Sequence, residues 1–182
     1  MKIVSEHLGG VLVLQARTFA DARGSFTETY SRKSLTALGI ADEFVQDNQS
    51  FSVKAGTVRG LHLQVEPHAQ GKLVRVLRGR ILDVVVDVRP GSPTLHRHFA
   101  VELSAREGTQ IWVPMGFAHG FCTLEPDTEV LYKVTDFYDP KAERSIKWDD
   151  PALGIRWPVT AAEATLSDKD RVAPPLSALT GL

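Results

Sequence analysis

The clearest strand signal in the sequence is Ile81-Leu82-Asp83-Val84-Val85-Val86-Asp87-Val88. Successive side chains of a β-strand point to opposite faces of a sheet. The even-numbered positions from 82 to 88 are all apolar and share one face. The odd-numbered positions, which include Asp83 and Asp87, share the other face. The stretch therefore predicts a strand with one fully apolar face.

Similar short apolar segments recur along the chain, separated by Gly, Pro, Asp and Asn. Besides 80–88, strands are predicted at residues 11–14, 24–30, 44–52, 72–77, 98–103, 109–113, 120–124, 129–136 and 145–148. Many short strands with frequent turn signals are typical of a sandwich or barrel. One early helix is predicted at 32–38, because Ser31 can cap its start and Gly39 can end it. A short helix is expected after Pro174-Pro175. The sequence thus predicts an all-β fold with minor helices.

Length and charge limit what the protein can be. A chain of 182 residues without repeats or linkers predicts one domain, residues 1–182. The net charge of −1 gives no basic field for a nucleic acid. No segment has the length of a membrane span or the apolar core of a signal peptide, so no membrane partner and a cytoplasmic location are expected. The single cysteine, Cys122, excludes an intramolecular disulfide and a multi-cysteine zinc site.

Several segments carry side chains that can do chemistry. In Arg59-Gly60-Leu61-His62-Leu63-Gln64, a strand would place His62 and Gln64 on one face. Lys72 begins a predicted strand, and Tyr132 alternates in phase with apolar neighbours. Taken singly, each has a plain structural interpretation: a satisfied histidine, a solvated lysine, and a core tyrosine with a bonded hydroxyl.

Taken together, these segments and others form a pattern. Its parts are residues 19–30, 44–48, 59–64, 70–74, 83–87, 114–121, 132–133, 155–158 and 166–170. In this order and spacing they closely resemble the dTDP-4-dehydrorhamnose 3,5-epimerase family, a branch of the cupin superfamily. The resemblance covers nearly the whole chain. It implies a cupin-type jelly-roll β-barrel with a few short helices, a homodimer, and no cofactor or metal.

The resemblance also implies roles for individual residues. The general base corresponds to His62, the carboxylate that hydrogen-bonds it to Asp170, and the general acid to Tyr132. Lys72 falls close to the sugar keto oxygen, and Tyr138 corresponds to a tyrosine that stacks on thymine. The remaining contacts to the nucleotide and phosphates fall on Arg23, Glu28, Gln46, Asn48, Arg59, His119, Glu143 and Lys169. In the implied homodimer, exchanged N-terminal strands carry Arg23 or Glu28 to the partner's site.

The implied reaction is epimerisation of dTDP-4-dehydro-6-deoxy-D-glucose at C3 and C5, which gives dTDP-4-dehydro-L-rhamnose through an enolate. Both carbons lie next to the carbonyl, so their protons are acidic. Inversion needs a base on one side, an acid on the other, and positive charge near the developing oxyanion. A histidine, a tyrosine and a lysine supply these three functions. The Gly-rich fingerprint of a dinucleotide site is missing from the sequence.

Three alternatives remain open at this point. The enzyme could invert only C3 or only C5 of a related dTDP-4-keto-6-deoxysugar. It could be a binding module, although pure binding needs neither base nor acid. It could also be a metal-dependent cupin, because His96 and His98 on one strand face would suit a metal together with Glu102.

Overall fold

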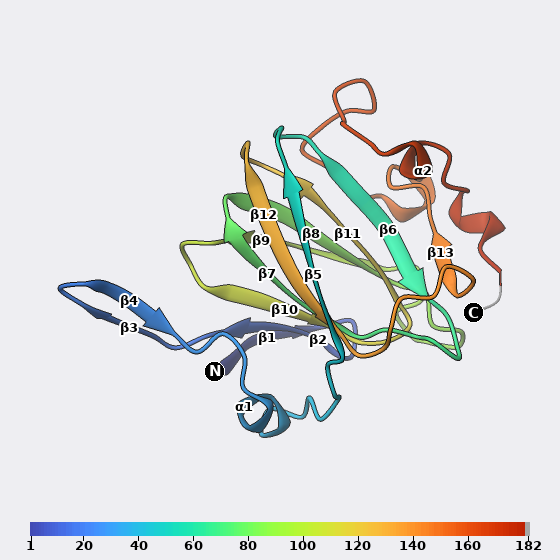
Figure 1. Ribbon diagram of the computed structural model, residues 1–182. Coiled ribbons are helices and arrows are strands. Elements are labelled where there is room, and N and C mark those ends of the chain that lie inside the picture. Colours follow the sequence, from blue (N-terminus) through green and yellow to red (C-terminus); the bar gives the residue numbers. More distant parts are fainter. Residues whose placement is uncertain (181–182) are drawn as a thin grey trace.

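Two antiparallel sheets packed face to face make up most of the structure, a computed structural model that describes residues 1–180 (Figure 1). The larger sheet contains, in spatial order, β1 (Lys2–His7), β2 (Val11–Gln15), β10 (Thr109–Val113), β7 (Lys72–Arg78), β12 (Thr128–Val134) and β5 (Gln46–Ser52). The smaller sheet contains β13 (Glu143–Ser145), β6 (Val58–Gln64), β11 (Phe117–Thr123), β8 (Arg80–Asp87) and β9 (His98–Ser104). This double-sheet arrangement is the predicted cupin-type jelly roll.

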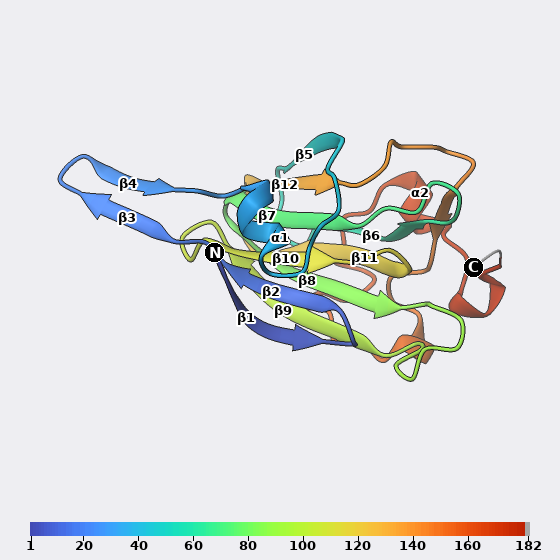
Figure 2. The ribbon, with the colours of Figure 1, turned by 90° about the horizontal axis from the view of Figure 1, so that it is seen from below.

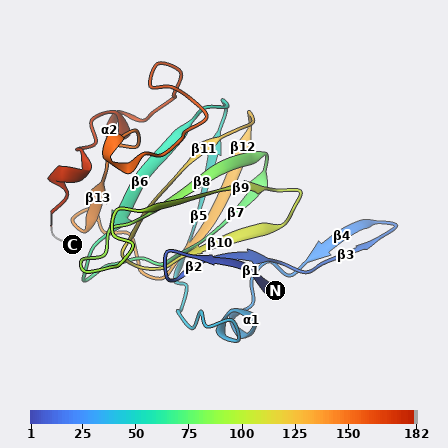
Figure 3. The same ribbon diagram turned by 180° about the vertical axis from the view of Figure 1, so that it is seen from behind.

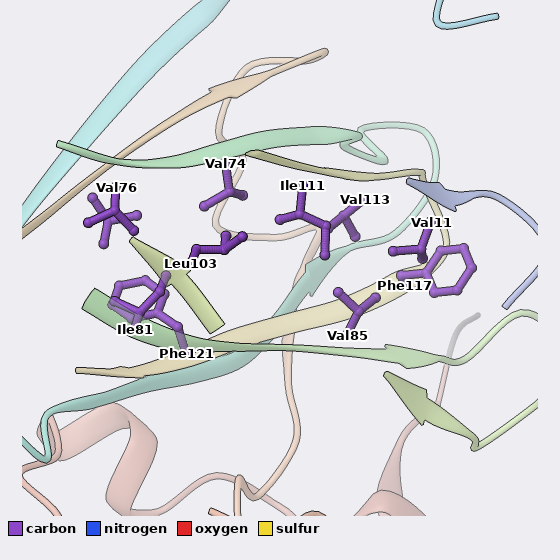
Figure 4. Packing of buried hydrophobic residues seen from close by; sticks show 11 residues of the cluster. Val11, Val74, Val76, Ile81, Val85, Leu103, Ile111, Val113, Phe117 and Phe121 are labelled. Atoms are coloured by element: carbon purple, nitrogen blue, oxygen red, sulfur yellow. The ribbon is translucent and has the colours of Figure 1, made fainter. Parts of the chain in front are cut away.

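The alternation along β8 is confirmed, and it divides the apolar side chains of this strand between two clusters. Ile81 and Val85 point into the space between the sheets, where they pack with residues of β7, β10 and β11 (Figure 4). Val84 and Val86 belong to a second cluster on the opposite face, beneath the C-terminal segment. Both faces of β8 are therefore buried, which makes it a central strand of the fold.

The C-terminal segment covers the outer face of the smaller sheet (Figure 3). It contains η1 (Pro151–Leu153), α2 (Asp168–Arg171) and η2 (Leu176–Ala178). The short final helix predicted from the sequence is thus a single 3₁₀ turn. Leu153 and Leu176 pack against the apolar cluster below. No helix within residues 1–180 is long and apolar enough to cross a membrane.

The N-terminal region lies on the other side of the barrel. Helix α1 (Arg32–Thr36) begins where predicted, because the Ser31 hydroxyl accepts a hydrogen bond from the Ser34 amide. Leu35 anchors the helix on the outer face of the larger sheet. Strands β3 (Thr18–Asp21) and β4 (Gly24–Thr27) form a hairpin that extends away from the barrel (Figures 1 and 2).

Several strand predictions differ from the structure. Strands β1, β3 and β6 were not among the predicted segments. Strand β1 is an edge strand with mostly exposed residues, whereas β6 alternates apolar and polar side chains only over Leu61–Gln64, after the interruption at Gly60. The predicted strand at 24–30 ends at Thr27, and the one at 145–148 is replaced by Glu143–Ser145. Strand β11 begins at Phe117, earlier than the predicted residue 120.

Candidate active site

Two hollows meet at three of the predicted site residues. The first, about 420 Å³ in volume, is lined by side chains from β5, β6, β7, β11 and β12 and from the segment 165–170. The second, about 240 Å³, is lined by residues of β5, β6, β7, β12 and β13 and by Tyr138. His62, Lys72 and Tyr132 line both hollows. Any molecule that fills both hollows must pass these three side chains.

His62 is held by a carboxylate from a distant part of the chain. His62 on β6 and Asp170 on α2 lie 2.6 Å apart, measured from Nε2 to Oδ1. Burial raises the pKa of Asp170, but its hydrogen bonds with His62 and Ser167 outweigh this and bring the pKa below its ordinary value. The charged carboxylate fixes the proton of the neutral imidazole on Nε2, which leaves a lone pair on Nδ1. A histidine in this state can accept a proton.

Lys72 is buried rather than solvated, contrary to its plain interpretation from the sequence. Its side chain lies between the sheets on β7, and Nζ donates a hydrogen bond to the backbone oxygen of His62 over 3.2 Å. Burial lowers the pKa of Lys72 to about 8, although the charges of Glu143 and Asp83 act in the opposite direction. The amine is therefore mostly protonated at neutral pH and presents its charge to the point where the hollows meet.

Tyr132 packs its ring against the core between the sheets, but within residues 1–180 its hydroxyl lacks the hydrogen-bond partner expected of a core tyrosine. It lies half-buried on β12, and none of the hydrogen bonds found within residues 1–180 engages its hydroxyl. Burial raises the pKa of Tyr132, with an opposing effect of Arg59 and an added one of Glu143. The hydroxyl thus keeps its proton at neutral pH and is free to donate it.

A second histidine–carboxylate pair lies beside the first. His119 on β11 is the cross-strand neighbour of His62, and its Nε2 lies 2.8 Å from Asp83 Oδ2. The other oxygen of Asp83 is buried without a hydrogen-bond partner in the described chain. Neither the local pattern nor the family resemblance predicts a role for Asp83 at the site. A carboxylate inside the valine-rich segment 81–88 is the signal that could have revealed it, since buried acids need a partner.

Two glycines bring the histidine-bearing strands together. A Cβ atom on Gly60 would lie 2.6 Å from Gly120 Cα, and one on Gly120 would lie 2.7 Å from the Arg59 carbonyl oxygen. Both distances are shorter than any side chain tolerates, so this close approach of β6 and β11 requires glycine at both positions.

The remaining predicted contacts mostly surround the two hollows. Arg59 lines the larger hollow and is held by the Ser52 hydroxyl and the Phe51 carbonyl oxygen. The smaller hollow is lined by Gln46, Asn48, Tyr138 and Glu143.

Glu143 links two of these contacts. Its carboxylate accepts a hydrogen bond from the Tyr138 hydroxyl and forms an ion pair with Lys169. Burial raises the pKa of Glu143, but Lys169 and Tyr138 together bring it below its ordinary value. The carboxylate therefore stays charged and ties α2 to the rim of the smaller hollow.

Arg23 and Glu28 do not reach this site within one chain, and Lys169 lines neither hollow itself but borders the smaller one through its ion pair with Glu143. Arg23 lies at the tip of the β3–β4 hairpin, with 89% of its side chain exposed and an ion pair to Asp21. Glu28 accepts a hydrogen bond from the Ser34 hydroxyl near α1. Neither lines the two hollows. Arg23 is thus held away from the site at the hairpin tip, and Glu28 at the hairpin base beside α1.

The alternative metal set is not assembled. His96 precedes β9 with a backbone φ of 64°, so it does not share a strand face with His98. Glu102 pairs instead with Arg80. Within residues 1–180, no group of three or more His, Cys, Asp or Glu side chains is arranged to hold a metal ion.

A model of the dTDP-4-dehydrorhamnose 3,5-epimerase family matches residues 5–178 of the chain. The chain belongs to this family. The family member from Sinorhizobium fredii is 49% identical over 98% of this chain and 91% of its own length. The crystal structure of the Bacillus anthracis enzyme with TDP and PPi bound has a TM-score of 0.94 and 48% identity, over 96% of this chain and 99% of that one. The Legionella pneumophila 3,5-epimerase, in complex with dTDP-4-keto-L-rhamnose, gives a TM-score of 0.93 and 42% identity, over 98% of this chain and 94% of that one. The two hollows described above thus belong to a 3,5-epimerase-type barrel.

Proposed function

We propose that this protein is a dTDP-4-dehydrorhamnose 3,5-epimerase, which converts dTDP-4-dehydro-6-deoxy-D-glucose into dTDP-4-dehydro-L-rhamnose in dTDP-L-rhamnose biosynthesis. The observation that carries the proposal is the convergence of His62, Lys72 and Tyr132 where the two hollows meet. Relatives of the same fold, one of them bound to dTDP-4-keto-L-rhamnose, support the choice of substrate.

The base and the acid come from opposite sheets. His62 belongs to β6 of the smaller sheet, whereas Tyr132 belongs to β12 of the larger sheet. A sugar ring between the sheets would therefore meet His62 on one face and Tyr132 on the other. Inversion of a carbon centre needs this arrangement, because the proton leaves from one face and returns to the opposite one.

The reaction follows from these positions. Nδ1 of His62 takes the proton from C3 or C5, and the electron pair of the broken C–H bond forms the enolate double bond. The carbonyl oxygen becomes an oxyanion, which the ammonium group of Lys72 stabilises. The Tyr132 hydroxyl then gives its proton to the opposite face of the same carbon. The carbonyl is restored, and solvent returns both residues to their starting protonation states.

The nucleotide part of the substrate would occupy the polar surroundings of the site. Arg59 and Lys169 offer positive charge to the diphosphate, and arginine can bind phosphate oxygens in bidentate fashion. Tyr138 is 54% exposed at the rim of the smaller hollow, where its ring is open to stacking on the thymine. His119, Gln46, Asn48 and Glu143 complete the proposed contacts.

A homodimer would use the two predicted residues that lie far from the site. The hairpin that carries Arg23 exposes a cross-strand pair, Phe19 and Phe26, with 49% and 71% of their surface accessible. Exposed aromatic pairs of this kind favour contact with another protein surface. We propose a second copy as the partner, with Arg23 and Glu28 directed to its site. The lone buried cysteine fits a reducing, cytoplasmic location.

Incubation of the purified protein with dTDP-4-keto-6-deoxyglucose, followed by NMR of the product, tests the function. Inversion at both C3 and C5 is the expected result. Inversion at one centre alone would assign the protein to the 3-only or 5-only epimerases. Recovery of unchanged substrate, without exchange of protons at C3 or C5, would overturn the proposal.

A further inference from the structure

Gln64 is a buried amide whose hydrogen-bonding groups are all in use. It lies on β6, two residues after His62, and is 4% exposed. Its Nε2 donates to the backbone oxygens of His68, over 2.7 Å, and Phe137, over 3.1 Å. Its Oε1 accepts from the Asp139 amide over 2.8 Å. These partners fix the orientation of the side-chain amide, because only the oxygen can accept from a backbone N–H group.

The partners of Gln64 lie on both sides of Tyr138. The Phe137 carbonyl precedes Tyr138 in the chain, and the Asp139 amide follows it. The Gln64 side chain is therefore hydrogen-bonded to the backbone immediately before and immediately after the tyrosine. The loop between β12 and β13 exposes Phe137 and Tyr138 by 61% and 54%, so apolar packing holds little of it. The Tyr138 amide makes only a long contact, 3.4 Å, with Gln46.

We infer that Gln64 is a positioning residue that holds Tyr138 in place for the base of the nucleotide. This inference rests on the proposed function, which assigns Tyr138 to the thymine ring. A loop that is already ordered loses less conformational freedom when a ligand binds, and this raises affinity. Strand β6, which carries the general base His62, thus also sets the position of the nucleotide end of the site. The proton transfers by His62 and Tyr132 do not depend on Gln64.

Calorimetric titration with dTDP tests this inference on the whole protein. Gln64→Met keeps the length of the side chain but removes all three hydrogen bonds. We expect the Kd for dTDP to rise about tenfold or more, whereas kcat at saturating substrate stays within about threefold of wild type. In a Tyr138→Ala background, the same substitution should change the Kd by less than about twofold, because the residue it positions is gone.

The matched control is Gln110→Met. Gln110 is also a buried amide, 2% exposed, and its Nε2 donates to the Thr29 carbonyl on the far side of the larger sheet. This control should leave the Kd for dTDP unchanged. Where Gln64→Met does not fold, Gln64→Glu serves instead, since it keeps the volume and the acceptor but loses both donated hydrogen bonds.

The outcomes separate the inference from the proposed function. Absence of dTDP binding by the wild-type protein would overturn the proposed function. Wild-type binding together with an unchanged Kd in the Gln64 variant would overturn the inference alone. An equal loss of affinity with and without Tyr138 would also overturn it, because a purely structural role predicts additive effects.

Discussion

Lys72 should determine the alkaline limit of activity. Burial lowers its pKa from 10.5 to about 8. At about pH 9, only about one tenth of Lys72 would carry a proton, whereas an ordinary lysine would remain almost fully charged. Because the neutral amine cannot stabilise an oxyanion, kcat/KM should stay flat up to about pH 8 and then fall about tenfold per pH unit. Tyr132 does not produce this fall, since its pKa is raised.

The assay is the pH profile of kcat/KM, which reports the ionisation of the free enzyme. In Lys72→Arg the side chain stays charged throughout this range, so the fall above about pH 8 should disappear even if the plateau is lower. Lys133→Arg is the control. Lys133 pairs with Asp47 on the opposite face of β12 from Tyr132, and its substitution should leave the profile unchanged. A fall that persists in Lys72→Arg, or a wild-type profile that is flat to about pH 9.5, would refute the assignment.

Four further outcomes are expected. The Tyr132→Phe variant should still exchange substrate protons with heavy water, but its rate of inversion should fall more than its rate of exchange. Mass spectrometry measures the exchange and NMR the inversion. Inversion of both centres at the wild-type rate would make Tyr132 a packing residue. Asp170→Asn should lower kcat about 10²–10⁴-fold with little change in dTDP affinity, since the tautomer of His62 is no longer fixed; an unchanged kcat would contradict this. Lys72→Met should stabilise the fold by about 1–3 kcal/mol near neutral pH in urea unfolding, because it removes a buried charge. This gain should shrink as the pH rises above about 8, where the folded wild type loses that charge, and a destabilised variant would argue against the buried ammonium. Turnover should survive exhaustive chelation with EDTA; loss of activity that a divalent ion restores would contradict a metal-free mechanism.

The sequence predicts those parts of the fold that depend on local patterns. The alternation in residues 81–88 defines a central strand, and the Ser31 hydroxyl marks the start of α1. Strand β6 gives a weaker local signal, because its apolar–polar alternation covers only Leu61–Gln64 and the polar side chains of that stretch belong to the site. The family resemblance, and not the local pattern, indicates the functional residues of this strand.

Long-range contacts are beyond local patterns. His62 and Asp170 are 108 residues apart, and only the packing of α2 against β6 brings them together. The burial of Lys72 has the same origin, since a lysine at the start of a strand is usually solvated. For Arg23 the fold has the opposite effect: its sequence motif is intact, but the hairpin that carries it leads away from the site of its own chain.

The contact between Gly60 and Gly120 bears on how this enzyme can be redesigned. The close approach of the two backbones at Gly60 and Gly120 sets the spacing of His62 and His119. Neither glycine can therefore be changed to reshape the cavity that these two strands line. Variant libraries intended to admit other sugars should therefore leave both positions unchanged. The larger sheet offers more freedom: Ser50 of β5 lines the larger hollow with a short side chain, and this position does not require glycine. New substrate specificity would have to be sought there.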